Sequence, residues 1–515
     1  MIELVLLAVA GKVLAKIMII RLNKHITDST CPESQCGFRR ERGTSDMIFV
    51  SRQLQEKCRE QRKDLCMAFI DLSKAFDTVN REFLWEIMRR AGCPNKFTNI
   101  VKAFHDHMQA TVVIGGVETE PFDVGVGVKQ GCVMAPVIFN IYLATPTRLF
   151  RESFPIEQGI GISYRLDGSV FNLGRLKART KVARDYITEL QYADDCALVA
   201  HTPEDLQQSI TALCNIYSAM GLAVNTDKTE VLHQWYNTDH PAPPEIRIGQ
   251  TVLKTTDQFC YLGSLMSSNC SMDAEINCRI SKAWAAFAKL RKNVIHTHNL
   301  RLATRVAVYK AICLSTLLYG LETITLYRRH INLLERFHMN CVKEMLGLTW
   351  QDKITHNDML LRTQLQSIEG ILTKTQLRWS GHVYRMHDDR LPKRVLYGQL
   401  SEGTRLPQGP KKRYKDQLKQ SLKHFNLNPI NFEEDAANRT RWRALCHQGP
   451  SHFETSRANV RDRRRQRRHE ARQADPPADD QFRCPECGRV CRSRIGLFSH
   501  RRTHGGQRPD VMEVT

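Results

Sequence analysis

Acidic residues are few in this 515-residue sequence: 54 Asp and Glu stand against 75 Lys and Arg, giving a formal net charge of +21. Such a deficit disfavours cationic partners and favours polyanions, among which nucleic acid is expected before an anionic membrane. The deficit is uneven, because residues 441–508 hold 17 arginines, no lysine and seven acidic residues. The excess positive charge is therefore concentrated near the C-terminus of a more balanced chain.

Dense cysteine and internal repeats are also missing. The 17 cysteines are scattered along the chain, which excludes a short disulfide scaffold of the secreted type and favours a reducing compartment. No repeat of about 20–50 residues is found, so a repeat architecture is not expected. Apolar residues at 42% and charged residues at 25% are ordinary for a globular protein and exclude wholesale disorder.

The apolar N-terminal stretch, Met1–Ile20, lacks the pattern of a signal peptide or a membrane span. Glu3 occupies a place where a signal peptide is basic, and Lys12 and Lys16 interrupt the run one helical turn apart. Roughly 18 uncharged residues in a row would be needed for a span. We therefore expect a buried helix, with a targeting segment and a membrane span as the alternatives.

Short β-rich runs alternate with helical patterns over residues 66–270. This mixed order predicts an α+β domain rather than a regular parallel sheet. Thr202 is a suitable N-cap for the last helix of this region, and Gly221 is a suitable stop. The expected strands are Cys66–Asp71, Ala110–Ile114, Gln191–Ala200 and Thr229–Trp235, and the expected helices are Arg81–Ala91, Asn95–Met108, Ala135–Leu149 and Pro203–Met220.

Acidic residues stand at two ends of apolar β-rich runs: Asp71 at the first, and the adjacent Asp194 and Asp195 at the second. Carboxylates between apolar residues are costly to bury unless a cation neutralises them, and hard oxygen donors suit Mg²⁺. Two such ions about 3.5–4 Å apart clamp the attacking and leaving oxygens of a phosphoryl displacement. Taken alone, the second site is equally explained by a hairpin turn built on Asp-Asp.

Further motifs flank the two acidic sites in a fixed order. Between the sites, a glycine-bearing turn feeds a helix start, where backbone N–H groups can meet a phosphate or a base pair. These motifs are Gln35–Arg39, Gly127–Cys132 with Ala135–Asn140, Gly221–Thr229 and Phe259–Gly263. With the acidic sites, they resemble the reverse transcriptase of non-LTR (LINE-type) retrotransposons over residues 10–270, and less specifically to about residue 450.

The resemblance implies a right-hand polymerase of the α+β class: palm and fingers with an antiparallel sheet, a helical thumb, a basic helical C-terminal region and a small ββα zinc finger. It implies an RNA-directed DNA polymerase whose partners are an RNA template, a DNA primer or target and dNTPs. The expected location is the nucleus, after a cytoplasmic ribonucleoprotein stage, without secretion or membrane contact. Compared with full-length members, the chain is expected to start inside the fingers, without an upstream endonuclease. The expected segments are 1–65 (partial fingers), 66–270 (palm and remaining fingers), 271–385 (thumb-like), 386–480 (basic linker and helical region) and 481–507 (zinc finger).

By the same resemblance, Asp71, Asp194 and Asp195 hold two Mg²⁺ ions, with Mn²⁺ as an alternative, and Leu72 adds its backbone carbonyl. Lys228 matches the lysine that protonates the leaving pyrophosphate. Phe76 matches the bulky gate that excludes a ribose 2′-hydroxyl. The remaining matches are Arg39 as a triphosphate or template contact, Gln130 and Gly131 as support for the template and incoming base, and Tyr261, Leu262 and Gly263 as the primer grip.

Each of these roles has an ordinary structural alternative. Phe76 is otherwise a core aromatic residue, Lys228 a solvated turn lysine and Tyr261 a β-strand residue. In the arginine-rich loop, Arg40 or Arg42 could take the place of Arg39.

A Cys/His motif near the C-terminus has the spacing C-x2-C-x12-H-x3-H, a complete tetrahedral set for one structural Zn²⁺. If His500 is the seventh helical residue, the base-reading positions are Ser493, Gly496 and Ser499, which make no bidentate base contacts. We therefore expect phosphate or RNA binding with little sequence choice. The expected ligands are Cys484, Cys487, His500 and His504, and the arginines expected to contact phosphates are Arg489, Arg492, Arg494, Arg501 and Arg502.

The arginine run 461–472 predicts a helical basic arm for nucleic-acid contact or nuclear import, with a solvated disordered linker as the alternative. For the whole chain, two other functions stay open. One is a catalytically inactive, retroelement-derived nucleic-acid-binding protein, which the expected truncation favours and the intact Asp71, Asp194 and Asp195 disfavour. The other is a regulatory zinc-finger protein, which a single finger with poor base-reading residues disfavours.

Overall fold

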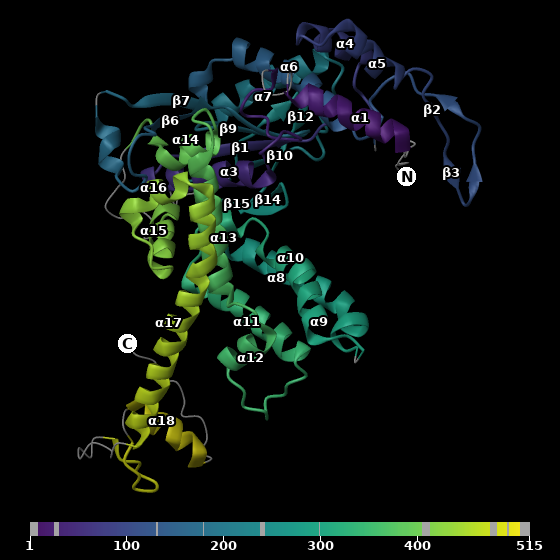
Figure 1. The fold of residues 1–515 in the computed structure, drawn as a ribbon. Helices are drawn as coiled ribbons and strands as arrows, with labels where there is room; N and C mark the ends of the chain where they lie inside the picture. The colour runs from purple at the N-terminus through teal and green to yellow at the C-terminus, as the bar shows by residue number, and fades with distance from the viewer. Residues whose placement is uncertain are drawn as a thin grey trace. The chain divides into compact units, whose positions relative to one another are not determined.

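A computed structural model of the chain describes residues 9–24, 30–129, 132–178, 180–236, 243–297, 299–403, 412–473, 482–491 and 494–504. The chain divides into two compact units, Met1–Pro450 and Ser451–Thr515 (Figure 1). Each unit is described by itself below.

At the centre of the first unit lies a five-stranded sheet in the order β13-β10-β1-β9-β8. The central strand β1 is antiparallel to both of its neighbours, which confirms the predicted antiparallel sheet, and only the edge pairing of β10 with β13 is parallel. The strands are β1 (Leu65–Ile70), β8 (Glu189–Tyr192), β9 (Asp195–Ala200), β10 (Glu230–Gln234) and β13 (Lys254–Thr255).

Strand β1 is a continuous apolar run because both faces of the sheet are covered. Ala68 and Ile70 join the core on one face, whereas Met67 and Phe69 join the core on the other. Burial of Ile70, Met67 and Phe69 contributes about 1.5–3 kcal/mol for each side chain. The first face is covered by α4 (Arg81–Arg90), α6 (Ala135–Ser153) and α7 (Pro203–Ala219), and the second by α3 (Thr44–Gln61) and the hairpin of β14 (Gln258–Tyr261) and β15 (Ser264–Ser267).

Local capping explains why α7 lies where the sequence predicted it. The Thr202 hydroxyl accepts a hydrogen bond from the Asp205 backbone N–H (3.1 Å), and Gly221 follows the helix with φ +77°.

The helix expected over 95–108 ends earlier, and two-residue strands replace the strand expected over 110–114. These elements are α5 (Asn95–Ala103), β2 (Gln109–Ala110), β3 (Val113–Ile114), β4 (Val117–Glu118) and β5 (Phe122–Asp123), with β2 paired to β5 and β3 to β4.

The N-terminal helix α1 (Val9–Leu22) is buried on one side only, so the expectation of a buried helix is partly wrong. Ala15 and Met18 pack into the core, whereas Val9 and Ile20 are exposed. An apolar helix needs neighbours on every side to be fully buried, and the described residues cover only one side of α1. No helix in the described ranges is long and apolar enough to cross a membrane.

The region after residue 271 is helical, as predicted, and has a core of its own. Two π-type segments, Arg291–Ile295 and Lys310–Leu314, interrupt its helices. The helices are α8 (Asp273–Leu290), α9 (Leu302–Tyr309), α10 (Ser315–Leu318), α11 (Arg328–Met345), α12 (His356–Thr363) and α13 (Ile368–Arg385), of which α8 to α12 form the teal and green group below the sheet in Figure 1.

Residues 391–403 and 412–450 also belong to the first unit and pack against its preceding parts. Strand β16 (Gln399–Leu400) pairs with β6 (Ile160–Tyr164), which pairs in turn with β7 (Ala183–Ile187). Trp442 donates its indole N–H to the Leu377 carbonyl (3.0 Å), and its ring fills the space beside Gly381, where a Cβ would lie 2.1 Å from the indole nitrogen. The helices of this part are α14 (Leu391–Tyr397), α15 (Tyr414–His424), α16 (Phe432–Ala437) and the start of α17 (Arg439–Gln473).

The second unit contains the rest of α17 and the Cys/His segment. The helix prediction for the arginine run is confirmed, because α17 extends through residue 473. In the Cys/His segment, Arg483 and Val490 form an isolated β-bridge, which is followed by α18 (Arg494–Arg501) and a short 3-10 turn, Arg502–His504.

Candidate active site and candidate metal centre

The sheet register brings the three candidate aspartates to one end of β1, β8 and β9. Ile70 pairs with Cys196, so Asp71 follows at the next position of the ladder, beside Asp195. Tyr192 pairs with Asp195 across the β8–β9 hairpin, which leaves Ala193 and Asp194 as its two-residue turn. The single strand expected over 191–200 is therefore two strands, because Ala193 adopts φ +56° and reverses the chain.

The three carboxylates influence one another electrostatically. Burial raises the pKa of Asp194, and the negative charge of Asp71 raises it further. Burial, Asp194 and Asp71 together raise the pKa of Asp195 to about 6. The three carboxylates do not bring one oxygen each to within 4.8 Å of the others. A divalent cation would relieve the repulsion and the desolvation, so the donor set suits one.

The hairpin turn is clamped by the side chain of Gln35. Its Oε1 accepts hydrogen bonds from the backbone N–H groups of Ala193 and Gly37 (2.8 Å each), and its Nε2 donates to the Ala193 carbonyl (3.0 Å). Gly37 lies so close that a Cβ there would be 2.2 Å from the Ala193 nitrogen. The backbone bond from Cys36 N–H to the Gln191 carbonyl (2.9 Å) ties the same loop to β8. Gln35 and Gly37 thus fix the turn that carries Asp194.

The segment around Asp71 is held by the turn that follows α7. The backbone N–H of Asn225 donates to the Asp71 carbonyl, and the N–H of Ser73 donates to Ala223, both at 2.8 Å. Leu72 forms an antiparallel bridge with Val224 and occupies its non-hydrogen-bonded position. The Leu72 carbonyl therefore points away from the partner strand. The ammonium of Lys228, from the same turn, lies 3.8 Å from Asp71 Oδ2.

Phe76 lies partly buried beside this segment. Its ring stacks on Phe139 of α6, with centroids 4.2 Å apart, and its carbonyl accepts a hydrogen bond from the Val128 N–H (2.8 Å). The glycine-bearing loop therefore passes next to Phe76. Gln130 and Gly131 of that loop lie outside the described residues.

Arg39 is buried and used within its own loop. Its Nη1 donates to the backbone carbonyls of Pro32 (2.8 Å) and Gln35 (3.0 Å). A guanidinium held in this way stabilises the loop that clamps the Ala193 turn. Arg40 and Arg42 are the two arginines that could take the role predicted for Arg39. Arg42 pairs with Glu33, whereas Arg40 is exposed.

The expected primer grip is the tight turn between β14 and β15. Tyr261 is buried, and its hydroxyl donates to the Leu190 carbonyl (3.0 Å), so its side chain belongs to the core. Leu262 and Gly263 make the turn with φ +48° and +79°. The turn is braced by two side chains that the sequence did not single out: the Tyr319 hydroxyl donates to the Leu262 carbonyl (3.0 Å), and Arg279 donates to the Gly263 carbonyl.

The Cys/His segment forms a candidate metal centre of a different chemical kind. One ligand atom from each of its four residues lies within 4.8 Å of every other. Two thiols and two imidazoles at this separation suit one Zn²⁺. The closest pairs are Cys487 Sγ with His500 Nε2 and His500 Nε2 with His504 Nε2, both at 3.0 Å, and Cys484 Sγ lies 3.7 Å from His504 Nε2.

Helix α18 starts at Arg494, so His500 is its seventh residue, as the sequence argument assumed. Ser499 is exposed on this helix, and Ser493 lies outside the described residues. No side chain of α18 is buried, so hydrophobic packing does little to hold the segment together.

Residues 2–266 match the model of the family described as reverse transcriptase (RNA-dependent DNA polymerase). A transposon-derived protein of Caenorhabditis elegans is 27% identical over 212 residues, which cover 40% of this chain and 74% of that protein. The RNA-directed DNA polymerase from the mobile element jockey of Drosophila funebris is 20% identical over 353 residues. That match covers 67% of this chain and 35% of the polymerase, so the chain spans about a third of this relative. Among solved structures, apo telomerase from Candida tropicalis is 11% identical with a TM-score of 0.35, over 85% of this chain and 61% of that chain.

Proposed function

Because the chain belongs to the reverse transcriptase (RNA-dependent DNA polymerase) family, we propose that it acts as the RNA-directed DNA polymerase of a non-LTR retrotransposon. The observation that carries this proposal is the β1–β9 register, which sets Asp71 beside Asp195 and next to the Asp194 turn. Three carboxylates from two strand ends are the donor set that nucleotidyl transfer with two divalent ions requires. The printed name of the jockey relative supports the same activity.

Asp71, Asp194 and Asp195 would hold the divalent ions, Mg²⁺ or alternatively Mn²⁺. When bound, such ions neutralise the triphosphate and lower the pKa of the primer 3′-hydroxyl. The raised pKa values of Asp194 and Asp195 support this assignment, because they arise from burial and mutual repulsion that a cation would offset. The Leu72 carbonyl, which is unused by its bridge to Val224, would add one further oxygen.

Lys228 and Phe76 would handle the incoming nucleotide. The Lys228 ammonium, 69% exposed and 3.8 Å from Asp71, can turn toward the leaving pyrophosphate and donate a proton there. The partly buried Phe76 ring is braced by Phe139, so it can exclude a ribose 2′-hydroxyl by occupying its space. Gln130 and Gly131 would support the template and the incoming base. The turn of Tyr261, Leu262 and Gly263 would contact the primer.

The proposed partners are an RNA template, a DNA primer and dNTPs, in the nucleus. The Cys/His segment would bind one structural Zn²⁺ through Cys484, Cys487, His500 and His504, which the grouping of their ligand atoms supports. Its exposed arginines, with those of α17, would contact phosphates rather than read bases. Arg39 is the weakest of these assignments, because Pro32 and Gln35 already accept from its guanidinium.

Primer extension on an RNA template tests the proposal. The full chain should extend a DNA primer with dNTPs and Mg²⁺, and Asp194→Asn should lower the rate about 10²–10³-fold, because it removes a ligand of the ions that neutralise charge in the transition state. The control is Asp167→Asn. Asp167 is an exposed aspartate outside the carboxylate centre, and it pairs with Arg165.

The outcomes separate the alternatives. Extension by wild type and Asp167→Asn but not by Asp194→Asn supports the proposal. If wild type and Asp194→Asn are equally inactive, the chain is a nucleic-acid-binding relic of a polymerase. If both extend equally well, the assignment of the carboxylates is wrong.

A further inference from the structure

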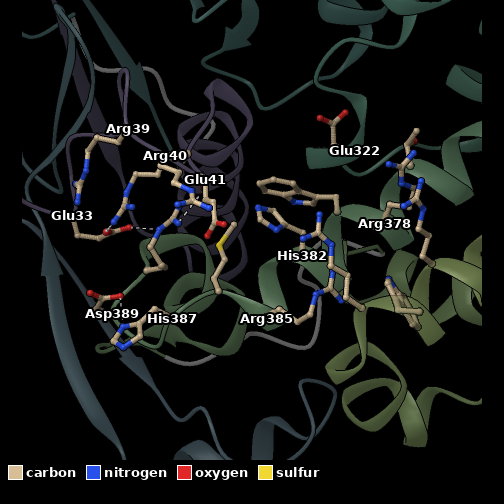
Figure 2. A pocket seen from close by; sticks show the side chains of 18 of the residues that line it. Glu33, Arg39, Arg40, Glu41, Glu322, Arg378, His382, Arg385, His387 and Asp389 are labelled. Carbon is tan, nitrogen blue, oxygen red and sulfur yellow. Dashed lines mark hydrogen bonds and ion pairs between the residues drawn. The ribbon is translucent and has the colours of Figure 1, made fainter. Parts of the chain in front are cut away.

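A large cavity of the first unit lies apart from the carboxylate centre, because none of the three aspartates lines it. It has a volume of about 1450 Å³ and is built from the loop 31–42, the second half of α13 with the residues that follow it, and the start of α17. Its lining contains eight arginines and four acidic residues. Figure 2 shows Arg39 and Arg40 on one side, Arg378 on the other and His382 between them.

Four of the eight arginines already have partners. Arg390 pairs with Glu33 (2.6 Å) and with Asp46 (2.7 Å), and Arg42 pairs with the same Glu33. Arg385 donates to the Ala436 carbonyl (2.6 Å), and Arg39 donates to its own loop as described above. These arginines build the cavity wall rather than offer a binding group.

The other four, Arg40, Arg378, Arg439 and Arg443, are exposed. Within the described ranges, no ion pair or hydrogen bond of their guanidinium groups is found. They come from three separate segments, so their approach to one cavity is not a local charge run on one helix face. Of the four acids in the lining, Glu33 is paired with arginines, and the eight arginines outnumber all four acids. The cavity therefore keeps unbalanced positive charge, which suits a polyanion.

Aromatic rings line the same cavity. Trp379 is half-buried, and its indole N–H is a buried donor without an acceptor among the described residues. Its ring centroid lies 5.8 Å from that of His382. Burial and the charges of Arg390 and Arg385 lower the pKa of His382, so this ring is neutral at pH 7 and can stack. Unpaired arginines beside half-exposed aromatic rings are the combination that binds unstacked bases and their phosphates.

The cavity continues toward the predicted primer grip. A neighbouring cavity of about 540 Å³ shares Glu322, Thr375 and Arg378 with it and is also lined by Tyr319. The Tyr319 hydroxyl donates to Leu262 in the β14–β15 turn. Small-molecule sites measure about 300–1,000 Å³, so the combined space suits several linked nucleotides rather than one.

We propose that this groove binds a single-stranded polynucleotide, with Arg378, Arg439 and Arg443 on its phosphates and Trp379 and His382 against its bases. A duplex is disfavoured, because paired bases cannot reach recessed rings. The binding needs neither divalent metal nor dNTP, so it stands apart from the proposed polymerase centre. RNA and DNA strands share this chemistry and are distinguished by the test.

The test measures binding of the full chain to fluorescein-labelled oligonucleotides of about 12 residues, a length within the site sizes of single-strand grooves. Single-stranded RNA, single-stranded DNA of the same sequence and duplex RNA are titrated in EDTA at several salt concentrations. Replacing all three arginines (R378A/R439A/R443A) should weaken single-strand binding about 10-fold or more and reduce the salt slope by about 2, at roughly 0.7 per phosphate contact. The control R301A/R336A/R362A removes three exposed arginines that line neither cavity and should bind like wild type.

The aromatic rings have their own variants. Trp379→Ala and His382→Ala should each weaken single-strand binding about 10-fold and leave duplex RNA binding unchanged. Trp350→Ala, which removes a tryptophan that is 80% exposed elsewhere, is the matched control. Because Trp379 also packs on Phe49, thermal melting of each variant identifies a loss caused by unfolding. In wild type, photo-crosslinking of thiouridine-containing RNA or thiothymidine-containing DNA should label the peptide that contains residues 379–385.

Loss of binding for RNA alone, for DNA alone or for both supports the groove and identifies its strand. Equal affinities of R378A/R439A/R443A and its control, or a wild-type crosslink that maps outside residues 379–385, would overturn the proposal. An equal loss for duplex RNA would overturn the single-strand assignment. Asp194→Asn should bind like wild type, so an inactive polymerase leaves this result unchanged.

Discussion

The carboxylate centre and the Cys/His segment are two candidate metal sites that the chain builds in opposite ways. The carboxylates come from positions 71 and 194–195 and meet only because β1 pairs with β9. The four Cys and His ligands lie within residues 484–504 and are brought together by a short turn and one helix. One site is positioned by a buried sheet, and the other by local chain geometry.

The packing around the two sites differs accordingly. The β1 and β9 strands are buried on both faces, so their ends are fixed by the core whether or not a cation is present. In the Cys/His segment, Cys484 is buried but no side chain of α18 is. We therefore expect a bound metal to contribute little to the fold at the carboxylate centre and much to the fold of the Cys/His segment.

The largest effect is expected from removing zinc. Structural Zn²⁺ in small finger modules contributes an apparent binding free energy of about 10–16 kcal/mol at neutral pH. Chelation, or Cys487→Ser, should therefore unfold residues 482–504 in the full chain and expose them to trypsin. The melting temperature of the first unit should stay unchanged.

The matched control for the zinc prediction is Cys491→Ser. This half-buried cysteine lies in the same segment but outside the ligand set, so its replacement should preserve trypsin resistance. Resistance that survives both chelation and Cys487→Ser would mean that packing alone holds the segment, and the contrast between the two sites would fail.

A smaller but clear loss is expected from Gly37→Ala. The new Cβ would lie 2.2 Å from the Ala193 nitrogen, so the loop or the Asp194 turn must move. Overpacking of this kind costs about 1–3 kcal/mol of unfolding free energy, and a displacement of about 1 Å can slow an enzyme about 10²-fold. Urea denaturation and primer extension measure the two effects.

Gly43→Ala is the control for this variant, because nothing lies within 4 Å of its Cβ position and its φ of −148° is ordinary extended backbone. It should match wild type in both assays. Wild-type activity of Gly37→Ala would show that the loop of Gln35 and Gly37 does not position Asp194.

The sequence predicts features that are built locally better than features that depend on pairing between distant segments. The Cys/His ligands are close in sequence, so spacing alone indicated them, and the seventh-residue position assumed for His500 agrees with α18. The aspartates were found because each borders an apolar run, and the ends of β1 and β9 lie at these residues. The helical region after residue 271 was predicted correctly for the same reason, because its pattern is local, whereas the antiparallel sheet was expected only from the family resemblance.

What sequence reasoning missed depends on contacts between distant segments. Gln35 was noted only as part of a motif, because its hydrogen bonds to Ala193 span 158 residues. The exposed side of α1 was not foreseen, because apolar residues surround most of this helix and the residues that cover one side of it come from distant segments. The groove beside α13 draws its arginines from three segments, and no single stretch indicates it.

The smallest effect concerns the pH dependence of stability at the carboxylate centre without metal. Burial, Asp194 and Asp71 raise the pKa of Asp195 to about 6 in the folded chain, from an ordinary value near 3.8. The folded state therefore binds more protons than the unfolded state between these values, and stability falls as pH rises from about 4 to 6. Asp195→Asn should remove this loss and stabilise the chain at pH 8 in EDTA, by less than about 1 kcal/mol because the side chain is only partly buried and solvent screens its charge.

Denaturation curves of wild type and Asp195→Asn at pH 4.5 and pH 8 check this expectation, with and without Mg²⁺. The difference should shrink at the lower pH, where Asp195 is mostly protonated, and Mg²⁺ should stabilise wild type more than the variant. Asp167 is the opposite control, because hydrogen bonding to Arg165 lowers its pKa to about 2, so Asp167→Asn gains nothing at pH 8. If Asp195→Asn is less stable than wild type at pH 8 without metal, the carboxylates do not repel one another, and the core does not hold them together against their charge.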